Sequence, residues 1–447
     1  MTQPPKPKAR EGEVSLRRYL RLFREDILSA QPERLYRAWM AEFRTPFFRS
    51  FLVNQPELVK RILKESTTNF PKSTRVSEGL RPLLGDSVFL SNGPDWERQR
   101  RIIDPAFEGG RLKDTYPAMW AATDALVGRL HEGEVEIEEA ASFAAADVIF
   151  RTLFSIPIED ATASRVFSAF KVYQRTQPVV NFAAFVPLPR WMPRPFQRRT
   201  IQSARAIRAL IEELTSARMA EIEAGTAPDD LATKIMTMED PETGHRFTAG
   251  EMVDQVAVFF LAGHETSASV LAWALYLLAM HPDWQEQVAA EAQTLTGKGL
   301  SEVSQLRVTR DVFREALRLY PPVPMMVRQA ACPNEMRDRR VPKGSQVVLS
   351  AWHLHRHSRL WDDPDGFDPG RWATENGKTC LRDAFIPFSA GPRVCPGAGF
   401  AMVEGPLLLA RAVQAYQFEV IEGREPVPAA HLTLRAKDGI WVRLSKR

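Results

Sequence analysis

The chain has 447 residues, of which 44% are hydrophobic and 26% charged, so it is long enough to build a large buried core. Its formal net charge of +4 is small and no basic stripe alternates with aromatic residues, so the composition does not indicate a nucleic-acid-binding protein. Three cysteines, Cys332, Cys380 and Cys395, are too few and too scattered for a disulfide framework, which is typical of a reducing compartment.

The N-terminus, Met1 to Glu13, is polar and proline-rich and lacks the apolar core of a signal peptide. No run of about 18 or more apolar residues occurs in the chain, so no membrane span is expected. These features predict a soluble cytoplasmic protein. Residues 1–30 are expected to be disordered or loosely packed.

In the first third of the chain, the spacing of apolar residues predicts an amphipathic helix over 32–43, a short aromatic strand over 46–53 and a helix over 56–64. Residues 69–94 are rich in glycine and proline and are predicted to form an irregular loop. Such a long loop inside a compact domain is usually functional or mobile. Helices are predicted again over 118–130 and 140–154.

The middle of the chain begins with residues 164–196, which are rich in phenylalanine, valine and proline. A charged helix over 201–225 and a turn at 239–244 follow. The longest helical pattern of the chain then starts at Thr248 and runs to about Met280, where a His-Pro pair ends it.

The apolar middle of this long helix is interrupted by Ala262-Gly263-His264-Glu265-Thr266. A glycine inside a helix costs about 1 kcal/mol relative to alanine. Buried polar side chains cost more unless they are paired or hydrated. Tertiary packing alone is one explanation for keeping such a defect, and a functional site is the other.

Two helical pairs carry little information by themselves. Trp96 and Arg100 lie four residues apart, and Glu315 and Arg318 lie three apart, so each pair shares a helix face. A solvated charged face is the ordinary explanation for both. Tandem prolines after the second pair end its helix and start an extended segment that leads to Arg328.

The region 387–400 places one cysteine in a glycine-rich loop, directly before an apolar run over 398–410 that predicts a helix. A cysteine ahead of a helix N-terminus lies among unpaired backbone N–H groups, which favour its thiolate form. A lone cysteine is most often a buried structural residue. The spaced set is far more specific, and it consists of Phe388, Gly391, Arg393, Cys395 and Gly397.

This pattern, F-x-x-G-x-R-x-C-x-G, resembles the haem-binding loop of the cytochromes P450, in which a cysteine thiolate holds the haem iron. The resemblance implies that Cys395 is the axial metal ligand of haem b and that Arg393 meets a haem propionate. Phe388 would pack against the ligand side of the macrocycle, while Gly391 and Gly397 belong to the same cofactor-binding loop.

The polar stretch of the long helix resembles the distal motif of the same family. In that motif Ala262 and Gly263 would be the small residues that leave room for O2 over the haem. Thr266 would donate a hydrogen bond near the oxygen, and Glu265 would belong to a proton relay. His264 is expected to pack or to form a hydrogen bond.

Three further stretches resemble family motifs in the family's order. Trp96 and Arg100 match the helix that donates hydrogen bonds to a haem propionate, and Arg328 would be another propionate ligand. The segment around Arg371 resembles the P-x-R segment, although Gly370 stands where the family often has glutamate. Arg371 would complete a structural ion network with Glu315 and Arg318.

The resemblance also implies a substrate pocket, with residues 164–196 as its lid and with Val258, Phe259, Val323, Met325 and Leu432 in its wall. One alternative involves a different metal, because His353, His355 and His357 alternate and would share a face on a strand. These histidines also match the family's H-R-H stretch, and no second cluster with ligand spacing accompanies them.

Taken together, the motifs imply a mainly α (α+β) cytochrome P450 fold of the soluble bacterial type, with a small β-rich region near the N-terminus. We expect a single domain over 1–447. The implied reaction is the insertion of one oxygen atom from O2 into an apolar substrate, such as a fatty acid, a terpenoid, a steroid or an aromatic compound.

Since the chain ends soon after the cysteine loop, electrons are expected from a separate ferredoxin or flavodoxin with its NAD(P)H-dependent reductase. Arg98, Arg101 and Arg111 are candidates for receiving an acidic carrier. Two alternatives remain: a peroxide-using or isomerising haem-thiolate enzyme, and a non-catalytic haem-based sensor. The intact Glu265-Thr266 pair favours the monooxygenase.

Overall fold

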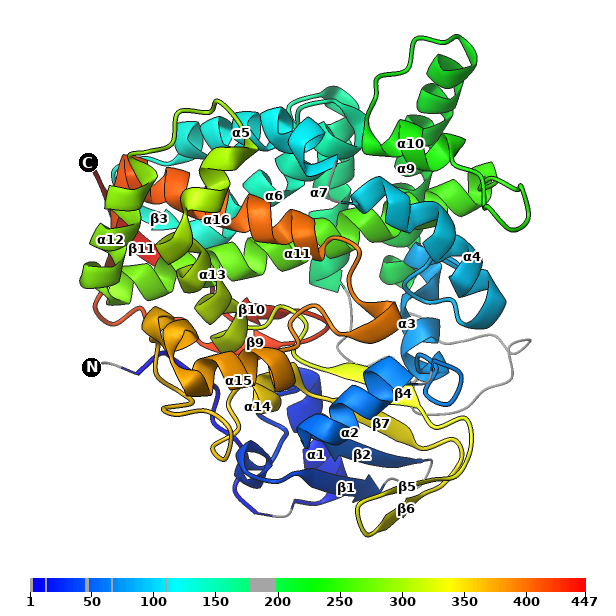
Figure 1. The fold of residues 1–447 in the computed structure, drawn as a ribbon, viewed down its shortest axis with the longest axis vertical. Coiled ribbons are helices and arrows are strands. Elements are labelled where there is room, and N and C mark those ends of the chain that lie inside the picture. Colours follow the sequence, from blue (N-terminus) through cyan, green and yellow to red (C-terminus); the bar gives the residue numbers. More distant parts are fainter. Residues whose placement is uncertain (1–2, 13, 45–47, 66, 109–110, 177–197) are drawn as a thin grey trace. The chain divides into compact units, whose positions relative to one another are not determined.

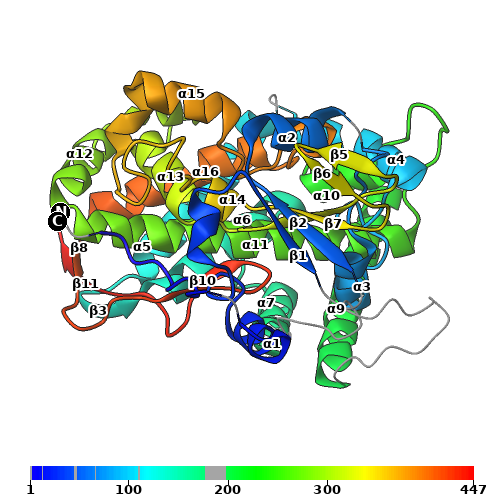
Figure 2. The same cartoon turned by 90° about the horizontal axis from the view of Figure 1, so that it is seen from below.

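The computed structural model describes residues 3–12, 14–44, 48–65, 67–108, 111–176 and 198–447 (Figures 1 and 2). The chain divides into two compact units. The first comprises residues 1–71, 123–142 and 266–447, and the second comprises residues 72–122 and 143–265. Three helices cross this division along the chain: α5 (Arg111–Arg129), α6 (Ile137–Phe154) and α11 (Ala249–Met280).

The second unit is built from helices. Besides its parts of α5, α6 and α11, it contains α3 (Thr74–Leu84), α4 (Gly93–Ile103), the 3-10 turn η3 (Asp104–Phe107), α7 (Ala161–Thr176), α9 (Arg198–Glu223) and α10 (Leu231–Thr237). The long helix α9 is central to this arrangement, because α3, α7 and α10 all pack on it. It buries one stripe that includes Ile207, Ile211 and Leu214, as expected of an amphipathic helix.

The first unit contains a four-stranded sheet in the order β1-β2-β7-β4. Its strands are β1 (Met40–Arg44), β2 (Arg49–Val53), β7 (Gln346–Leu349) and β4 (Met326–Gln329). β2 is parallel to β7 and the other pairs are antiparallel. The expected β-rich region near the N-terminus is therefore completed by strands from residues 326–349. A buried core on this sheet includes Phe51, Val53 and Trp361.

The remaining helices and turns of the first unit are α1 (Leu16–Glu25), η1 (Glu33–Tyr36), α2 (Pro56–Lys60), the π-helical turn η2 (Arg61–Glu65), α12 (Pro282–Ala292), η4 (Leu300–Gln305), α13 (Arg307–Leu319), α14 (Ala351–Leu354), η5 (Pro369–Ala373), α15 (Glu375–Asp383), η6 (Gly391–Arg393) and α16 (Ala398–Ala415). The other strands are β3 (Gly133–Glu136), β5 (Asn334–Met336), β6 (Arg339–Val341), β8 (Tyr416–Val420), β9 (Pro428–Ala430), β10 (Leu434–Ala436) and β11 (Trp441–Lys446). They form the sheet β3-β11-β8 and the hairpins β5-β6 and β9-β10.

Two sequence predictions of secondary structure were wrong. The helix predicted over 32–43 is only the 3-10 turn η1, and strand β1 follows it because residues 40–44 pair with β2. The loop predicted over 69–94 contains helix α3, which tolerates Gly79 and Pro82 because it buries Leu80, Leu83 and Leu84. In both places tertiary contacts override local propensity.

The N-terminal segment, expected to be loose or disordered, makes specific contacts over residues 4–10. Pro4 and Pro7 are buried, and the Tyr320 hydroxyl donates a hydrogen bond to the Pro5 carbonyl at 2.7 Å. The Lys6 ammonium lies 2.7 Å from an Asp365 carboxylate oxygen.

Helix α11 is the one helix among the described residues that is long and apolar enough to cross a membrane. Its most apolar window is 72% buried inside the protein, as in the core helix of a soluble protein. The polar stretch at residues 262–266 lies near the middle of this helix, far from either end.

Candidate functional site

Cys395 lies in a tight loop directly before α16. Its backbone N–H donates to the Phe388 carbonyl at 3.0 Å, so the two ends of the loop are tied together. Gly391 has φ +70°, and a methyl group there would overlap the Leu63 carbonyl oxygen of the π-helical turn η2. Glycine is therefore required at this position, both for its backbone angle and for the close approach. The side chain of Cys395 is exposed, as a ligand to a bound group requires.

The three cysteines differ in their surroundings. Cys380 is buried in the core, where burial raises the pKa of its thiol to about 11. A thiol in such a place is inert at neutral pH. Cys332 is half-buried beside Asn69 and Asn334. Cys395 alone combines exposure with a position at a helix N-terminus.

Two guanidinium groups meet near this loop inside the first unit. Arg393 donates to the carbonyls of Thr67 and Phe70 at 3.1 and 2.9 Å. Arg328, on β4, is 8% exposed, and burial together with the charge of Arg393 lowers its pKa to about 10. Among the residues that the structure describes, Arg328 has no carboxylate partner, and its one hydrogen bond is a 3.5 Å contact with the Val327 carbonyl.

A buried cation without a counter-charge costs free energy, and an anionic ligand removes that cost. Arg328, with Arg393 beside it, is therefore suited to a carboxylate-bearing group, such as a haem propionate. The donor set of the loop, a single exposed cysteine sulfur, suits an iron held by thiolate. The residues present thus fit a haem group.

The polar interruption of α11 combines buried and accessible residues. Glu265 is 8% exposed, whereas Thr266 and Phe259 are half-buried and Ala262 is exposed. Phe259, Ala262 and Thr266 are spaced by three and four residues and share one face of the helix. Val258, predicted with Phe259 as a pocket residue, is instead buried at 4% exposure.

Gly263 and His264 have packing explanations. A methyl group on Gly263 would overlap the Ile149 side chain of α6, so glycine permits the close approach of two helices. His264 is buried with its ring edge-to-face against Phe167, with ring centroids 5.4 Å apart. The packing explanation that the sequence left open therefore applies to these two residues.

Within the first unit, two segments predicted to line the pocket lie close together and adjoin α11. The Leu434 N–H donates to the Pro322 carbonyl at 2.9 Å, so the turn that carries Leu432 adjoins the segment with Val323 and Met325. Ser269 of α11 donates to the Leu434 carbonyl at 2.6 Å. The side chains of Val323, Met325 and Leu432 are half-buried. Of the predicted lid, residues 177–197 lie outside the described residues.

In the second unit, Trp96 and Arg100 lie on α4, as the sequence predicted. Trp96 is 6% exposed, and the Lys72 ammonium lies 5.8 Å from the centroid of its ring. The Arg100 guanidinium pairs with Asp104, with 2.8 Å between Nε and Oδ1. Burial raises the pKa of the Asp104 carboxyl.

Glu315, Arg318 and Arg371 form a buried ion network. The Glu315 carboxylate is 2.7 Å from Arg318 and 2.8 Å from Arg371, and the first pair is fully buried. Both arginines also donate to backbone carbonyls of residues 355–366. The network therefore joins α13 to the irregular segment that leads into η5.

The three alternating histidines do not lie on a strand. His353 is on α14 and His355 and His357 follow in a turn, with burial lowering their pKa values to about 3, 3 and 4 respectively. His355 accepts a hydrogen bond from the Ile386 N–H at 2.9 Å. No group of three or more His, Cys, Asp or Glu side chains suited to a metal occurs among the described residues.

The arginines suggested as a carrier surface are paired within the second unit. Arg98 pairs with Glu251, and Arg101 binds the buried carboxylate of Asp240 at 2.6 Å. The guanidinium of Arg101 holds the pKa of Asp240 far below its usual range. Removing these charges would disturb structural contacts, so a loss of carrier binding in such variants has a second explanation.

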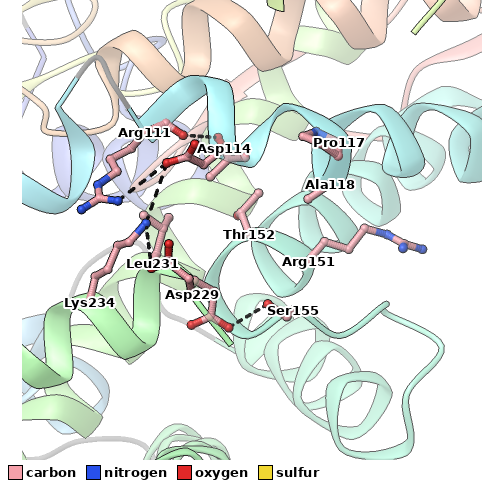
Figure 3. Close-up of a pocket in the computed structure, with 12 residues that line it drawn as sticks. Arg111, Asp114, Pro117, Ala118, Arg151, Thr152, Ser155, Asp229, Leu231 and Lys234 are labelled. Carbon is pink, nitrogen blue, oxygen red and sulfur yellow. Dashed lines mark hydrogen bonds and ion pairs between the residues drawn. The ribbon is translucent and has the colours of Figure 1, made fainter. Parts of the chain in front are cut away.

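A pocket of about 290 Å³ lies between α5, α6 and α10 (Figure 3). Lys234 lies in it between Asp114 and Asp229, at 4.0 and 3.1 Å from their carboxylates. Of the residues predicted to bind haem or substrate, none lines it, whereas Arg111 of the suggested carrier surface does.

One residue near the loop was missed by the sequence analysis. Glu404 of α16 is 2% exposed and accepts a hydrogen bond from the Ser267 hydroxyl of α11 at 3.3 Å. Burial raises the pKa of Glu404 to about 8, so the carboxyl keeps its proton at neutral pH. Its signal in the sequence is a single carboxylate within the apolar run that follows Cys395.

Comparisons with known proteins agree with this arrangement. The family model "Cytochrome P450" matches residues 39–441. Cyclooctat-9-en-7-ol 5-monooxygenase of Streptomyces melanosporofaciens is 33% identical over 86% of this chain and 83% of its own length. A cytokinin hydroxylase of Arabidopsis thaliana is 29% identical over 88% of this chain and 78% of its own length.

Solved structures share the fold. The haem domain of cytochrome P450DA superimposes with a TM-score of 0.79 at 24% identity, over 100% of this chain and 99% of that chain. A mutant of the same haem domain gives a TM-score of 0.82 at 24% identity, over 100% of this chain and 98% of its own. Sequence and fold together place this chain in the cytochrome P450 family of haem-iron monooxygenases.

Proposed function

We propose that this P450 monooxygenase holds haem b through the Cys395 thiolate. Arg328, Arg393, Trp96 and Arg100 would bind the haem propionates. The observation that carries this proposal is the buried Arg328 guanidinium beside the half-buried Arg393 of the exposed cysteine loop, because a buried cation next to a second cation favours an anionic ligand. The haem supplies the oxygen chemistry when it is bound.

The protein's own part is to supply protons and shape. Thr266 and Ala262 share the accessible face of α11, so we propose that the threonine hydroxyl donates a hydrogen bond there and that the adjacent Glu265 supplies protons. Phe259 on the same face, together with Val323, Met325 and Leu432, would exclude water and orient an apolar substrate. Val258 is left out of this set because it is buried.

For the substrate we propose a largely hydrocarbon molecule: a fatty acid, a terpenoid, a steroid or an aromatic compound. The name of the 33%-identical relative, which acts on an alkenol, supports a terpenoid-sized alcohol or alkene as the first class to test.

We further propose that the chain is one domain, that it works in the cytoplasm, and that a separate ferredoxin or flavodoxin with its NAD(P)H-dependent reductase provides electrons.

A spectral titration of the purified ferric protein against a panel of apolar ligands tests the substrate class. We expect a shift from low spin to high spin with one class, because a bound substrate displaces water from the haem. Product formed per NAD(P)H consumed, with a surrogate redox chain, then tests the monooxygenase reaction. Product made with peroxide alone, or without any oxidant, would instead indicate one of the alternative enzymes.

A further inference from the structure

Helix α1 has two sharply different faces. Tyr19, Leu20, Leu22 and Phe23 are half-buried, whereas Arg17, Arg18, Arg21 and Arg24 are all exposed. At 100° per residue, the four arginines fall on one side of the helix, opposite the apolar side chains. These four residues are called the arginine face below.

Helix α1 belongs to the first unit, and hydrogen bonds fix the chain at both of its ends (its position is shown in Figure 2). The Ser15 hydroxyl caps the start of α1 by accepting from the Arg18 N–H. At the other end, the Asp26 carboxylate accepts from the Ala430 N–H at 2.8 Å, and the Ile27 N–H donates to the Ala430 carbonyl at 3.0 Å. The helix is therefore fixed to strand β9 and is not a fraying terminus.

The net charge of the chain is concentrated in this region. Residues 1–25 contain seven Lys or Arg against three Glu, a balance of +4. The whole chain has a formal net charge of +4, so residues 26–447 sum to zero. Charge asymmetry of this kind indicates interaction with a polyanion or a membrane surface.

Helix stability does not explain the arginine face. Arg17 with Arg21, Arg18 with Arg21, and Arg21 with Arg24 are like-charge neighbours at i+4 or i+3, which destabilise a helix. The first turn contains no acidic residue, although its macrodipole favours one. Among the described residues, Glu25 is the sole carboxylate that pairs with the face, at 3.4 Å from the exposed Arg21. A negatively charged partner would relieve all of these repulsions.

We infer that the arginine face binds the surface of an anionic phospholipid bilayer. A basic helix with leucine and aromatic side chains on its other side has the composition of helices that lie at lipid interfaces. The apolar side chains of α1 are half-buried on the opposite side of the helix, so the exposed arginines are the side chains left to meet the headgroups. The inference concerns surface binding and is independent of the chemistry at Cys395.

Sedimentation of the haem-loaded protein with vesicles tests this inference. Vesicles of phosphatidylcholine are compared with vesicles that contain about one third phosphatidylserine. The test variant combines Arg17→Gln, Arg18→Gln, Arg21→Gln and Arg24→Gln. The control removes four exposed positive charges elsewhere and combines Lys60→Gln, Lys298→Gln, Arg307→Gln and Arg340→Gln.

We expect the wild type and the control to bind phosphatidylserine vesicles alike, and the test variant to bind up to about a thousandfold less, at about 1 kcal/mol for each arginine removed. Binding should fall steeply between about 0.05 and 0.5 M salt, since exposed charges are screened. Equal loss in both variants would reduce the effect to net charge and overturn the inference. So would an unchanged test variant, or wild-type binding to soluble polyglutamate but not to vesicles, which would indicate an acidic protein partner. Circular dichroism checks that both variants are folded.

Discussion

The buried carboxyl of Glu404 makes a specific prediction about stability and pH. It lies on α16, 2% exposed, with the Ser267 hydroxyl as its hydrogen-bond donor. Burial raises its pKa from 4.5 to about 8, against the smaller opposite effect of the Ser267 hydrogen bond. Replacing it with glutamine keeps the size and an acceptor oxygen but removes the ionisable group.

Proton linkage gives the direction in which the stability of the folded protein changes with pH. Below pH 4.5 both the folded and the unfolded carboxyl are protonated, so the group contributes no penalty. Above pH 4.5 the unfolded chain releases its proton while the folded chain keeps it, and stability is lost as the pH rises through about 8. Each pKa unit corresponds to about 1.4 kcal/mol, so the 2.5 units between pH 4.5 and pH 7 give a loss of about 3.5 kcal/mol at pH 7.

Urea unfolding of wild type and Glu404→Gln, followed by circular dichroism from pH 5 to 8, checks this reasoning. The free energy of unfolding of the variant should gain on that of the wild type steadily as the pH rises. Glu422→Gln, at an exposed glutamate, is the matched control and should show a flat difference. A difference for Glu404→Gln that does not change with pH would refute the raised pKa.

Three further variants test the loop, the ion network and the proton assignment. Gly391→Ala should lower haem retention, and it should lower the free energy of unfolding by about 1 to 3 kcal/mol, because the new methyl group adds an overlap to a positive φ. Gly423→Ala is the control and should keep its haem, because Gly423 also has a positive φ but no neighbour within 4 Å of the new methyl group. Arg371→Ala should cost about 3 to 5 kcal/mol in thermal unfolding because it leaves a buried carboxylate with one partner fewer, and Arg371→Lys should recover part of that loss. Thr266→Ala should lower product formed relative to NAD(P)H consumed and release peroxide, and unchanged coupling would refute its proposed role.

The features that the sequence predicted well are those whose chemistry is encoded within a few residues. The cysteine loop is local, and its glycine and cysteine positions follow from backbone angles and a helix N-terminus. Strand β1 was mistaken for part of a helix because its partner strand, which decides its conformation, lies outside the segment. Helix α3 was missed because burial of its leucines outweighs its Gly79 and Pro82.

Roles inside the site were harder to predict than its location. The spacing in α11 predicted a polar interruption, but it did not predict that Gly263 lies directly against the Ile149 side chain of α6. Nor did the sequence reveal Glu404, because a single glutamate in an apolar run has no pattern. Both facts depend on which helices lie against each other, and that is decided by packing over the whole unit.

The buried arginines show how the structure separates a binding site from a scaffold. Arg318 and Arg371 share the Glu315 carboxylate and donate to backbone carbonyls, so their charges are compensated within the protein. Arg328 is equally buried, but its charged neighbour is Arg393, and no carboxylate among the described residues pairs with it. The sequence alone does not distinguish these four arginines. The charges of Arg318 and Arg371 are balanced inside the protein, whereas a buried charge such as that of Arg328 gains most from an anionic ligand.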